Sequence, residues 1–359
     1  MNKKRLAVAP MMEWTDRHCR SFHRLLTKEA VLYTEMVTSG ALLHGDQARH
    51  LDYGTIEHPV VLQLGGSESS DLARCADLAQ QWNYDEIDLN CGCPSERVQK
   101  GAFGACLMAE PALVAECVRS MRSVYDRPIS VKHRLGLDQM DASQSKEDYQ
   151  FVLDFMLAVA DAGASQVTIH ARNAVLKGLS PKENRTKPAL HYEVAKQLRI
   201  DTQKSYPHLK VLLNGGLESN EQIANHWQDF DGFMVGRAAY HFPAMLLGWD
   251  DLLQSQGSAA GYLFSETEWH RIQIGLVQQT KQWFDDCQER QKPFYLGAIT
   301  RHIMGLAHGR AGARRWRQRL SDHGALAKVK TKEAIEEFFF EASLELGDWA
   351  AFDLNAQIA

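Results

Sequence analysis

The segment Asn90-Cys91-Gly92-Cys93-Pro94 places two cysteines where an apolar run gives way to a glycine and a proline. Gly92 and Pro94 mark the end of a strand, and loops on a rigid scaffold are where catalytic groups often lie. Cys93 is therefore a candidate for chemistry. Two other interpretations stay open here, because most cysteines are small buried apolar residues and a Cys-x-Cys pair could be half of a metal site.

The spacing of the cysteines weakens the metal interpretation. Structural zinc sites usually space paired ligands by two to four residues and need a second pair, which this sequence lacks. The seven cysteines are scattered and odd in number, which argues against a disulfide framework and indicates a reducing compartment. We expect a cytoplasmic protein without a structural metal. No secretory signal is visible, and no run of about 18 apolar residues that could span a membrane occurs.

The elements that position Cys93 follow from the order of the apolar runs. The 359 residues, 45% of them hydrophobic, suffice for one large domain and a smaller one. Eight short β-branched runs alternate with helical segments, which predicts a parallel sheet. Eight units over roughly 245 residues favour a closed (β/α)₈ TIM barrel. The first strand is not followed by a Gly-x-Gly-x-x-Gly turn, which argues against a dinucleotide-binding fold. The expected strands are 6–9, 31–36, 59–65, 86–91, 129–134, 166–171, 210–214 and 232–236.

Helical periodicity fills the intervals and takes over near the C-terminus. In the barrel we expect helices at 71–82, 111–124, 149–162, 191–198 and 220–226, with Asp71 and Asn220 as N-caps. Strand-like runs disappear after Glu266, and helical runs at 269–283, 294–306 and 311–320 predict a small α-helical bundle. The segment 257–261 is typical of a linker. We therefore divide the chain into a barrel at 1–255, a helical domain at 262–340 and a tail at 341–359.

Polar residues follow the expected strands at the end where TIM-barrel active sites lie. Each has a structural explanation when taken alone, but together they predict a polar, cationic mouth on an apolar barrel. Gly215, Gly216 and Gly236 allow close approach of the backbone, and Arg237 adds a bidentate charge, which favours a phosphate site after the last two strands. The strand-end residues are Pro10, Met11, Met12, Gln63, Asn90, Cys93, Lys132, Arg134, His170, Asn214, Gly215, Gly216, Gly236 and Arg237.

The charge of the chain is unevenly distributed. From Arg290 to Lys332 there are eleven Lys or Arg against one acidic residue, so this segment carries plus ten within a chain of net charge minus five. A solvated helix face would usually carry compensating Glu and Asp, which this segment does not. A basic segment in an acidic protein is typical of a surface that binds the phosphate backbone of a nucleic acid.

Several segments resemble, in order and spacing, the tRNA-dihydrouridine synthases: Ala9-Pro10-Met11-Met12, Asp88-Leu89-Asn90-Cys91-Gly92-Cys93-Pro94, Asn214-Gly215-Gly216 and Gly236-Arg237. The block Gly178-Leu179-Ser180-Pro181-Lys182-Glu183-Asn184-Arg185 is similar to the A subfamily, which acts on uridines 20 and 20a of the tRNA D-loop. The polar stretch 139–148 and the tail beyond about 340 depart from the family pattern.

The resemblance implies an FMN enzyme that reduces a uracil ring in tRNA with electrons from NADPH, which would enter the same mouth. It implies that Pro10, Met11 and Met12 surround the flavin ring and that Gln63, Lys132 and His170 hold its polar edge. The phosphate end would lie at Asn214, Gly215, Gly216, Gly236 and Arg237. Cys93 would protonate carbon 5 of the uracil while carbon 6 receives the hydride. Cys91 is a weaker candidate for this role.

The tRNA contacts come partly from the resemblance and partly from charge. The resemblance implies contacts at Asn90, Lys182, Arg185 and Arg301, and charge alone adds Arg314 and Arg315. Because the flavin and Cys93 would lie inside the mouth, the target uridine would have to leave its stack. We expect a monomer, since the tRNA itself supplies a large partner surface.

Two other functions compete with this one. An FMN barrel acting on a free pyrimidine such as dihydroorotate would share the flavin site, but it has no use for a segment of charge plus ten. A non-catalytic RNA-binding protein on an inherited barrel would not need Cys93, Lys132 and His170 at strand ends. Binding of flavin and the salt dependence of tRNA binding would separate the three.

Overall fold

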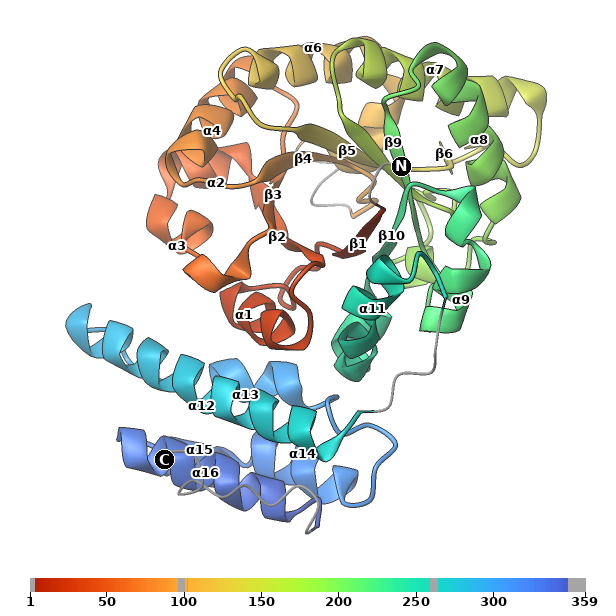
Figure 1. Ribbon diagram of the computed structural model, residues 1–359. Coiled ribbons are helices and arrows are strands. Elements are labelled where there is room, and N and C mark those ends of the chain that lie inside the picture. The colour runs from red at the N-terminus through yellow and green to blue at the C-terminus, as the bar shows by residue number, and fades with distance from the viewer. Residues whose placement is uncertain (1–3, 96–100, 102, 259–263, 348–359) are drawn as a thin grey trace.

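The computed structural model describes residues 4–95, 101, 103–258 and 264–347. Eight parallel strands close into a barrel in the order β1-β10-β9-β8-β5-β4-β3-β2, with helices outside it (Figure 1). The predicted TIM barrel is confirmed, and all eight expected strands lie within two residues of the observed ones. They are β1 (Arg5–Val8), β2 (Val31–Thr38), β3 (Val60–Gly65), β4 (Glu86–Cys91), β5 (Ile129–Arg134), β8 (Gln166–His170), β9 (Lys210–Asn214) and β10 (Gly232–Val235).

The barrel interior is closed at its N-terminal end. Arg5 donates through Nη1 to Glu86 Oε2 and to Gln166 Oε1, each at 2.7 Å. Above this pair lies a small apolar layer that includes Val31, Tyr33 and Met234. A much larger apolar layer separates the strands from the surrounding helices. The opposite, C-terminal end of the barrel is therefore the end at which a cavity can open.

The helices around the barrel confirm the alternating pattern, but both expected N-caps are wrong. The α4 helix begins two residues before Asp71, after Glu68, and Asp71 pairs with Arg74 in its first turns. Ser219 caps α9, because the Asn220 side chain instead accepts a bond from Trp249 Nε1. The helices are α1 (Arg17–Leu26), α2 (Ser39–His44), α3 (Gln47–Leu51), α4 (Ser69–Gln81), α6 (Pro111–Arg122), α7 (Lys146–Asp161), α8 (Tyr192–Ser205), α9 (Asn220–Asn225), α10 (Arg237–His241) and α11 (Trp249–Gln254).

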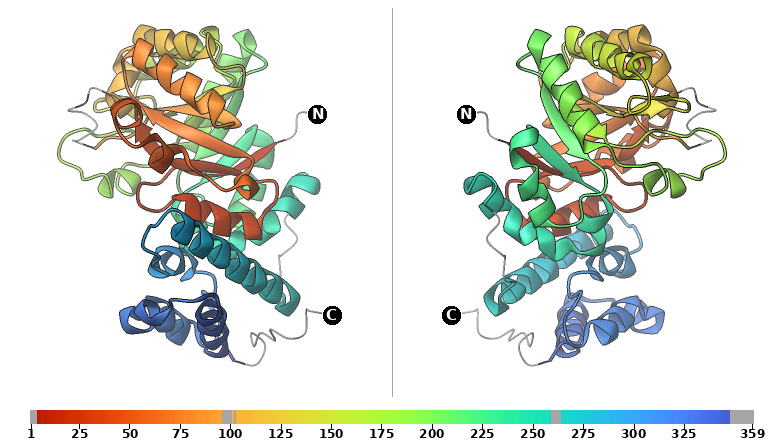
Figure 2. Two further views of the ribbon diagram at one scale, coloured as in Figure 1. Left: turned by 90° about the vertical axis from the view of Figure 1, so that its left-hand side faces the viewer. Right: turned by 90° about the vertical axis from the view of Figure 1, so that its right-hand side faces the viewer.

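A helical domain packs on one side of the barrel, against α1 (Figures 1 and 2). It contains α12 (Glu266–Glu289), α13 (Gly297–Ile303), α14 (Ala313–Ser321), α15 (His323–Lys328) and α16 (Lys332–Leu344). The α12 and α13 helices contact α1, whereas α16 packs on α12 and α14. The α16 helix ends at Leu344, so it includes the first four residues of the expected tail. Part of the expected linker, and the tail from residue 348, lie outside the described residues.

The polar stretch 139–148 contributes the second strand of a short hairpin and then the start of a helix. The β6 strand (Gly136–Leu137) pairs with β7 (Met140–Asp141), and Ser145 caps α7. The β6 strand lies beside the 310 helix η2 (Gly104–Ala109), which follows the Cys93 loop. Among the described residues, no helix is both long and apolar enough to cross a membrane.

Candidate active site

A cavity of about 540 Å³ opens at the C-terminal ends of the strands, within the range of about 300–1,000 Å³ typical of ligand pockets. The strand-end residues that the sequence analysis selected come together in its lining. Four expected RNA contacts, Lys182, Arg301, Arg314 and Arg315, do not line it. Those that do are Pro10, Met11, Met12, Gln63, Asn90, Cys93, Lys132, Arg134, His170, Arg185, Asn214, Gly215, Gly216, Gly236 and Arg237.

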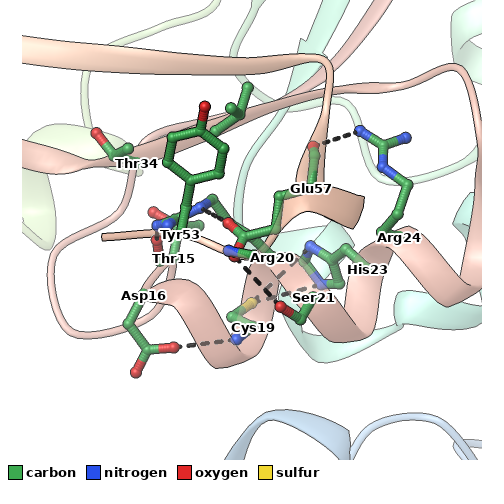
Figure 3. A network of polar contacts seen from close by, with 12 residues as sticks. Thr15, Asp16, Cys19, Arg20, Ser21, His23, Arg24, Thr34, Tyr53 and Glu57 are labelled. Carbon is green, nitrogen blue, oxygen red and sulfur yellow. Dashed lines mark hydrogen bonds and ion pairs between the residues drawn. The ribbon is translucent and has the colours of Figure 1, made fainter. Parts of the chain in front are cut away.

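The loop after β1 forms one wall of the cavity and is held from behind by α1. Met11 N donates to Thr15 Oγ1 at 2.9 Å, which tightens the turn that carries the two methionines. The buried Arg20 donates to Thr15 O at 2.8 Å and to Glu57 Oε2 at 2.6 Å (Figure 3). The loop position is thus fixed by an ion pair that is shielded from water.

A chain of buried amides and one carboxylate shapes the Cys93 loop. Gln63 Nε2 donates to Asp88 Oδ2 at 2.7 Å, and Asn90 Nδ2 donates to Gln63 Oε1 at 3.0 Å. Asn90 Oδ1 in turn accepts from the backbone N–H groups of Gly92 and Cys93 at 3.1 and 2.9 Å. The Asn90 amide therefore makes two hydrogen bonds to this turn and one to Gln63, which leaves it little to offer an RNA base.

Arg134 connects the Cys93 loop to the segment 178–185. Its Nε donates to Gly92 O at 2.9 Å, and its Nη1 donates to Asn184 O at 2.9 Å and Asn173 O at 3.2 Å. Arg134 is buried, and burial lowers its pKa to about 10. Among the described residues its guanidinium forms no ion pair, so it holds the two loops through backbone carbonyls alone.

Lys132 and His170 line the cavity, and within the described part of the chain neither side chain forms a hydrogen bond or ion pair. Burial and the neighbouring Arg134 lower the pKa of Lys132, whereas Asp88 raises it. Burial and the surrounding cations lower the pKa of His170 well below its ordinary value, so its ring is uncharged at neutral pH. Burial also raises the pKa of Asp88. Donors left without partners in a cavity suit a polar, electron-rich ligand edge.

The glycines after β9 and β10 fit a close-lying ligand. Gly215 has a φ of +104°, and a Cβ there would lie 2.5 Å from His170 Cδ2. At Gly236 the nearest atom to such a Cβ would be Ala9 Cβ at 3.6 Å, so the missing side chain leaves room beside Met11. Arg237 donates to Arg185 O at 3.2 Å and, within the described ranges, forms no ion pair. Its charge is available to an anionic group at this end of the cavity.

Comparisons with known proteins agree with this geometry. The family model described as "Dihydrouridine synthase (Dus)" matches residues 7–343. The chain belongs to the dihydrouridine synthase family. Similar proteins named tRNA-dihydrouridine(20/20a) synthase include one from Vibrio parahaemolyticus, 48% identical over 89% of this chain and 91% of the relative. Others are from Vibrio cholerae, 47% identical over 92% and 98%, and Pseudomonas putida, 47% identical over 89% and 88%.

Dihydrouridine synthases are flavin-dependent. The cavity of this chain has features that fit a flavin. Lys132 and His170 offer unpartnered polar groups, and the room at Gly236 together with Arg237 offers a place for a charged end. The predicted family is confirmed, whereas the role of each residue stays a prediction. Cys91 is fully buried beneath the cavity lining, and burial raises the pKa of its thiol well above the ordinary value.

The four expected RNA contacts outside the cavity differ in their surroundings. Lys182 is exposed just before the 310 helix η3 (Glu183–Arg185). Arg301 reaches the cavity rim and donates to the backbone oxygen of Glu13. Arg314 is exposed, and no described residue pairs with it, whereas Arg315 forms an ion pair with Glu345 at 3.0 Å. Three further cations of the basic segment, Arg290, Arg319 and Lys332, also pair with acidic residues that lie outside it.

Sequence reasoning missed several residues that line this dihydrouridine synthase cavity or hold its loops in place. Asp88 belongs to the recognised motif, and strand alternation puts it on the same face as Asn90, which could have identified it. Asn184 lies in the similar 178–185 block, but its bonds to the segment near Val175 have no sequence signal. The cavity-lining side chains of Trp14, His241 and Phe242 were also missed, because nothing in their spacing points to a shared mouth.

Proposed function

We propose that this protein reduces uridine to 5,6-dihydrouridine in the D-loop of tRNA, at positions 20 and 20a, with FMN as cofactor and NADPH as electron donor. The name shared by relatives at 46–48% identity supports the substrate and the positions. The observation that carries the proposal is the single cavity that gathers Cys93 with the unpartnered Lys132 and His170. A pyrimidine ring beside Cys93 would have a proton donor within reach, and a flavin held by Lys132 and His170 would be its electron source.

The residues at one end of the cavity would bind and orient the FMN. FMN, when bound, supplies the hydride that reaches carbon 6 of the uracil. Lys132 would offer a fixed positive charge to its polar edge in a water-poor site, with His170 and Gln63 beside it. Pro10, Met11 and Met12 would pack against the ring. The charged end would lie at Asn214, Gly215, Gly216, Gly236 and Arg237, where backbone space and one guanidinium suit a phosphate.

Cys93 has the proton-transfer role in this proposal. Its thiol would give a proton to carbon 5 of the uracil, a general-acid step typically worth about 10²–10⁴ in rate. Asn90 and Arg134 fix the loop on both sides of Gly92, so the thiol has a set position relative to the cavity. The full burial of Cys91 supports Cys93 rather than Cys91 in this role.

The residues at the cavity rim would bind the tRNA through their positive charge. The target uridine must leave its stack to enter the mouth. Arg185 and Arg301 at the rim, with Lys182 nearby, would bind the adjacent phosphates, while Asn90 would act mainly by shaping the loop. Arg314 and Arg315 would extend the contact over the helical domain. We further propose a monomeric, cytoplasmic enzyme with a barrel at 1–255, a recognition domain at 262–340 and a tail at 341–359.

Mass spectrometry of D-loop fragments tests the proposal directly. Unmodified tRNA is incubated with the purified protein and NADPH, and the expected result is a two-hydrogen gain on uridines 20 and 20a. A gain at other uridines would keep the reaction and overturn the positions. No gain on any tRNA, with FMN bound and NADPH oxidised, would overturn the substrate and favour a free pyrimidine.

A further inference from the structure

A row of aromatic rings leads from the cavity wall to the helical domain. Trp14 stacks on Tyr240 with ring centroids 4.5 Å apart and an interplanar angle of 14°. His241 meets the edge of Trp14 at 5.0 Å, and Phe242 meets the edge of His308 at 4.4 Å. His308 belongs to the turn after α13, so the outer end of the row joins the two domains beside the mouth.

The outer end of this row is exposed. Phe242 is 41% exposed and Met12 is 57% exposed, and among the nine large exposed apolar side chains of the described ranges only these two line the cavity. His241 and His308 are exposed as well. Burial and the adjacent Arg237 lower the pKa of His241, so its ring stays uncharged at neutral pH. The exposed phenyl ring of Phe242 and the uncharged imidazole of His241 therefore lie together where water meets the cavity.

Three arginines lie at the same mouth as these rings. Arg185 and Arg237 line the same mouth, and Arg301 reaches its rim through Glu13. None of the three forms an ion pair with any residue that the structure describes. Aromatic faces combined with unpaired cations are the pairing by which proteins hold unstacked nucleotides, because rings stack on bases while cations meet phosphates.

We propose that Phe242, supported by His308, is a stacking platform for the nucleobase next to the target uridine. The inference rests on the proposed function, since a uridine that enters the cavity leaves a neighbouring base without its stacking partner. An exposed ring at the mouth replaces that partner. The platform would thereby stabilise the tRNA in the conformation that delivers the uridine, whatever the identity of the neighbouring base.

Kinetics of Phe242 variants test this platform. Phe242→Leu keeps the apolar surface but removes the aromatic face, and we expect kcat/KM for unmodified tRNA to fall about tenfold, mainly through KM. Phe242→Trp should retain near wild-type values. The rate at which NADPH reduces the bound flavin should be unchanged in both. Ile200→Ala on α8, equally exposed at 41% but outside the cavity lining, is the matched control and should behave as wild type.

Abasic substrates identify the contact itself. tRNAs that lack the base on the 5′ or the 3′ side of the target uridine are compared with intact tRNA in both enzymes. The wild-type enzyme should lose activity on one of the two abasic tRNAs. The Phe242→Leu enzyme should have the same activity on that abasic tRNA as on intact tRNA. Equal activity of Phe242→Leu and wild type on intact tRNA would overturn the inference, as would a raised KM of Phe242→Leu for NADPH. Additive losses of activity from the Phe242→Leu change and from removal of the base would also overturn it. If wild type reduces no tRNA at all, the proposed function fails instead.

Discussion

The cavity floor, formed by strand-end residues such as Asn90, Cys93 and Lys132, and the helical domain hold their polar groups in opposite ways. At the floor, side chains from neighbouring strands are buried and aligned by short bonds, such as those of Asn90 to the Cys93 loop. On the helical domain, cations project into solvent, and several pair with exposed carboxylates. Interaction free energies between polar groups at the cavity floor depend on desolvation and geometry. Interaction free energies on the helical domain depend on charges that solvent and salt screen. The floor should therefore respond to single atoms and pH, and the helical domain to salt.

The strongest test of the floor removes the thiol of Cys93. Cys93→Ala should lower the rate of dihydrouridine formation by about 10²–10⁴, because the general acid is lost, while flavin binding and NADPH oxidation persist. Single-turnover product formation on unmodified tRNA measures this. Cys106→Ala, which changes a partly exposed cysteine outside the cavity lining, is the control. Product formation at the wild-type rate would remove Cys93 from the reaction.

The charge of Lys132 is the second test of the floor. Lys132→Met keeps the aliphatic length, and we expect reduction of the bound flavin by NADPH to slow by about 10²-fold, since one preorganised charge is lost. Stopped-flow absorbance of the flavin reports this rate. Lys204→Met, at an exposed lysine paired with Asp201 on α8, should leave it unchanged. Flavin reduction at the normal rate in Lys132→Met would contradict the assignment.

Acid should destabilise the barrel through its buried histidines. Burial lowers the pKa of His18 and His133 to about 4 and that of His23 to about 3, from an ordinary value of 6.5. Below pH 6.5 the unfolded chain takes up protons that the folded one does not, so stability is full above this pH and falls toward pH 4. Burial raises the pKa values of Asp88 and Glu35, which opposes the trend, whereas the lowered pKa of His170 adds to it.

Thermal unfolding at several pH values checks this expectation. The Tm should fall steadily as the pH drops below about 6.5, and added salt should alter the fall little because these groups are buried. A Tm that is constant down to pH 4.5 would show that the histidines are hydrated in the folded protein. A fall that salt abolishes would assign it to surface charge instead.

The smallest effect compares two adjacent arginines of α14. Arg314→Ala should weaken tRNA binding a few-fold and lower the slope of log affinity against log salt by about one, because its charge is unpaired. Arg315→Ala should do less, since Arg315 is already engaged by Glu345. Salt titrations of tRNA binding measure both. A larger loss for Arg315→Ala would show that the tRNA displaces Glu345.

The sequence predicts the barrel and most of the cavity because both follow local rules. Parallel strands end at one rim, so residues as distant as Gln63 and Arg237 meet without any knowledge of side-chain contacts. Pairings made across the chain follow no such rule. The segment around Arg315 has only one acidic residue of its own, yet Glu345 reaches it from the end of α16. The expected cap at Asn220 failed for the same reason, since Trp249 competes for its side chain.

The contacts of α13 with the barrel make the two domains a matched pair. His302 Nε2 lies 3.0 Å from Asp16 Oδ2, the carboxylate that also caps α1, and Arg301 holds the backbone of Glu13. The helical domain thus supports the loop that carries Met11 and Met12. A chimaera that exchanges this domain between relatives, in order to redirect the enzyme to another uridine, would also alter the cavity wall that this loop forms. Transplanting the loop together with the domain is the design that respects this dependence.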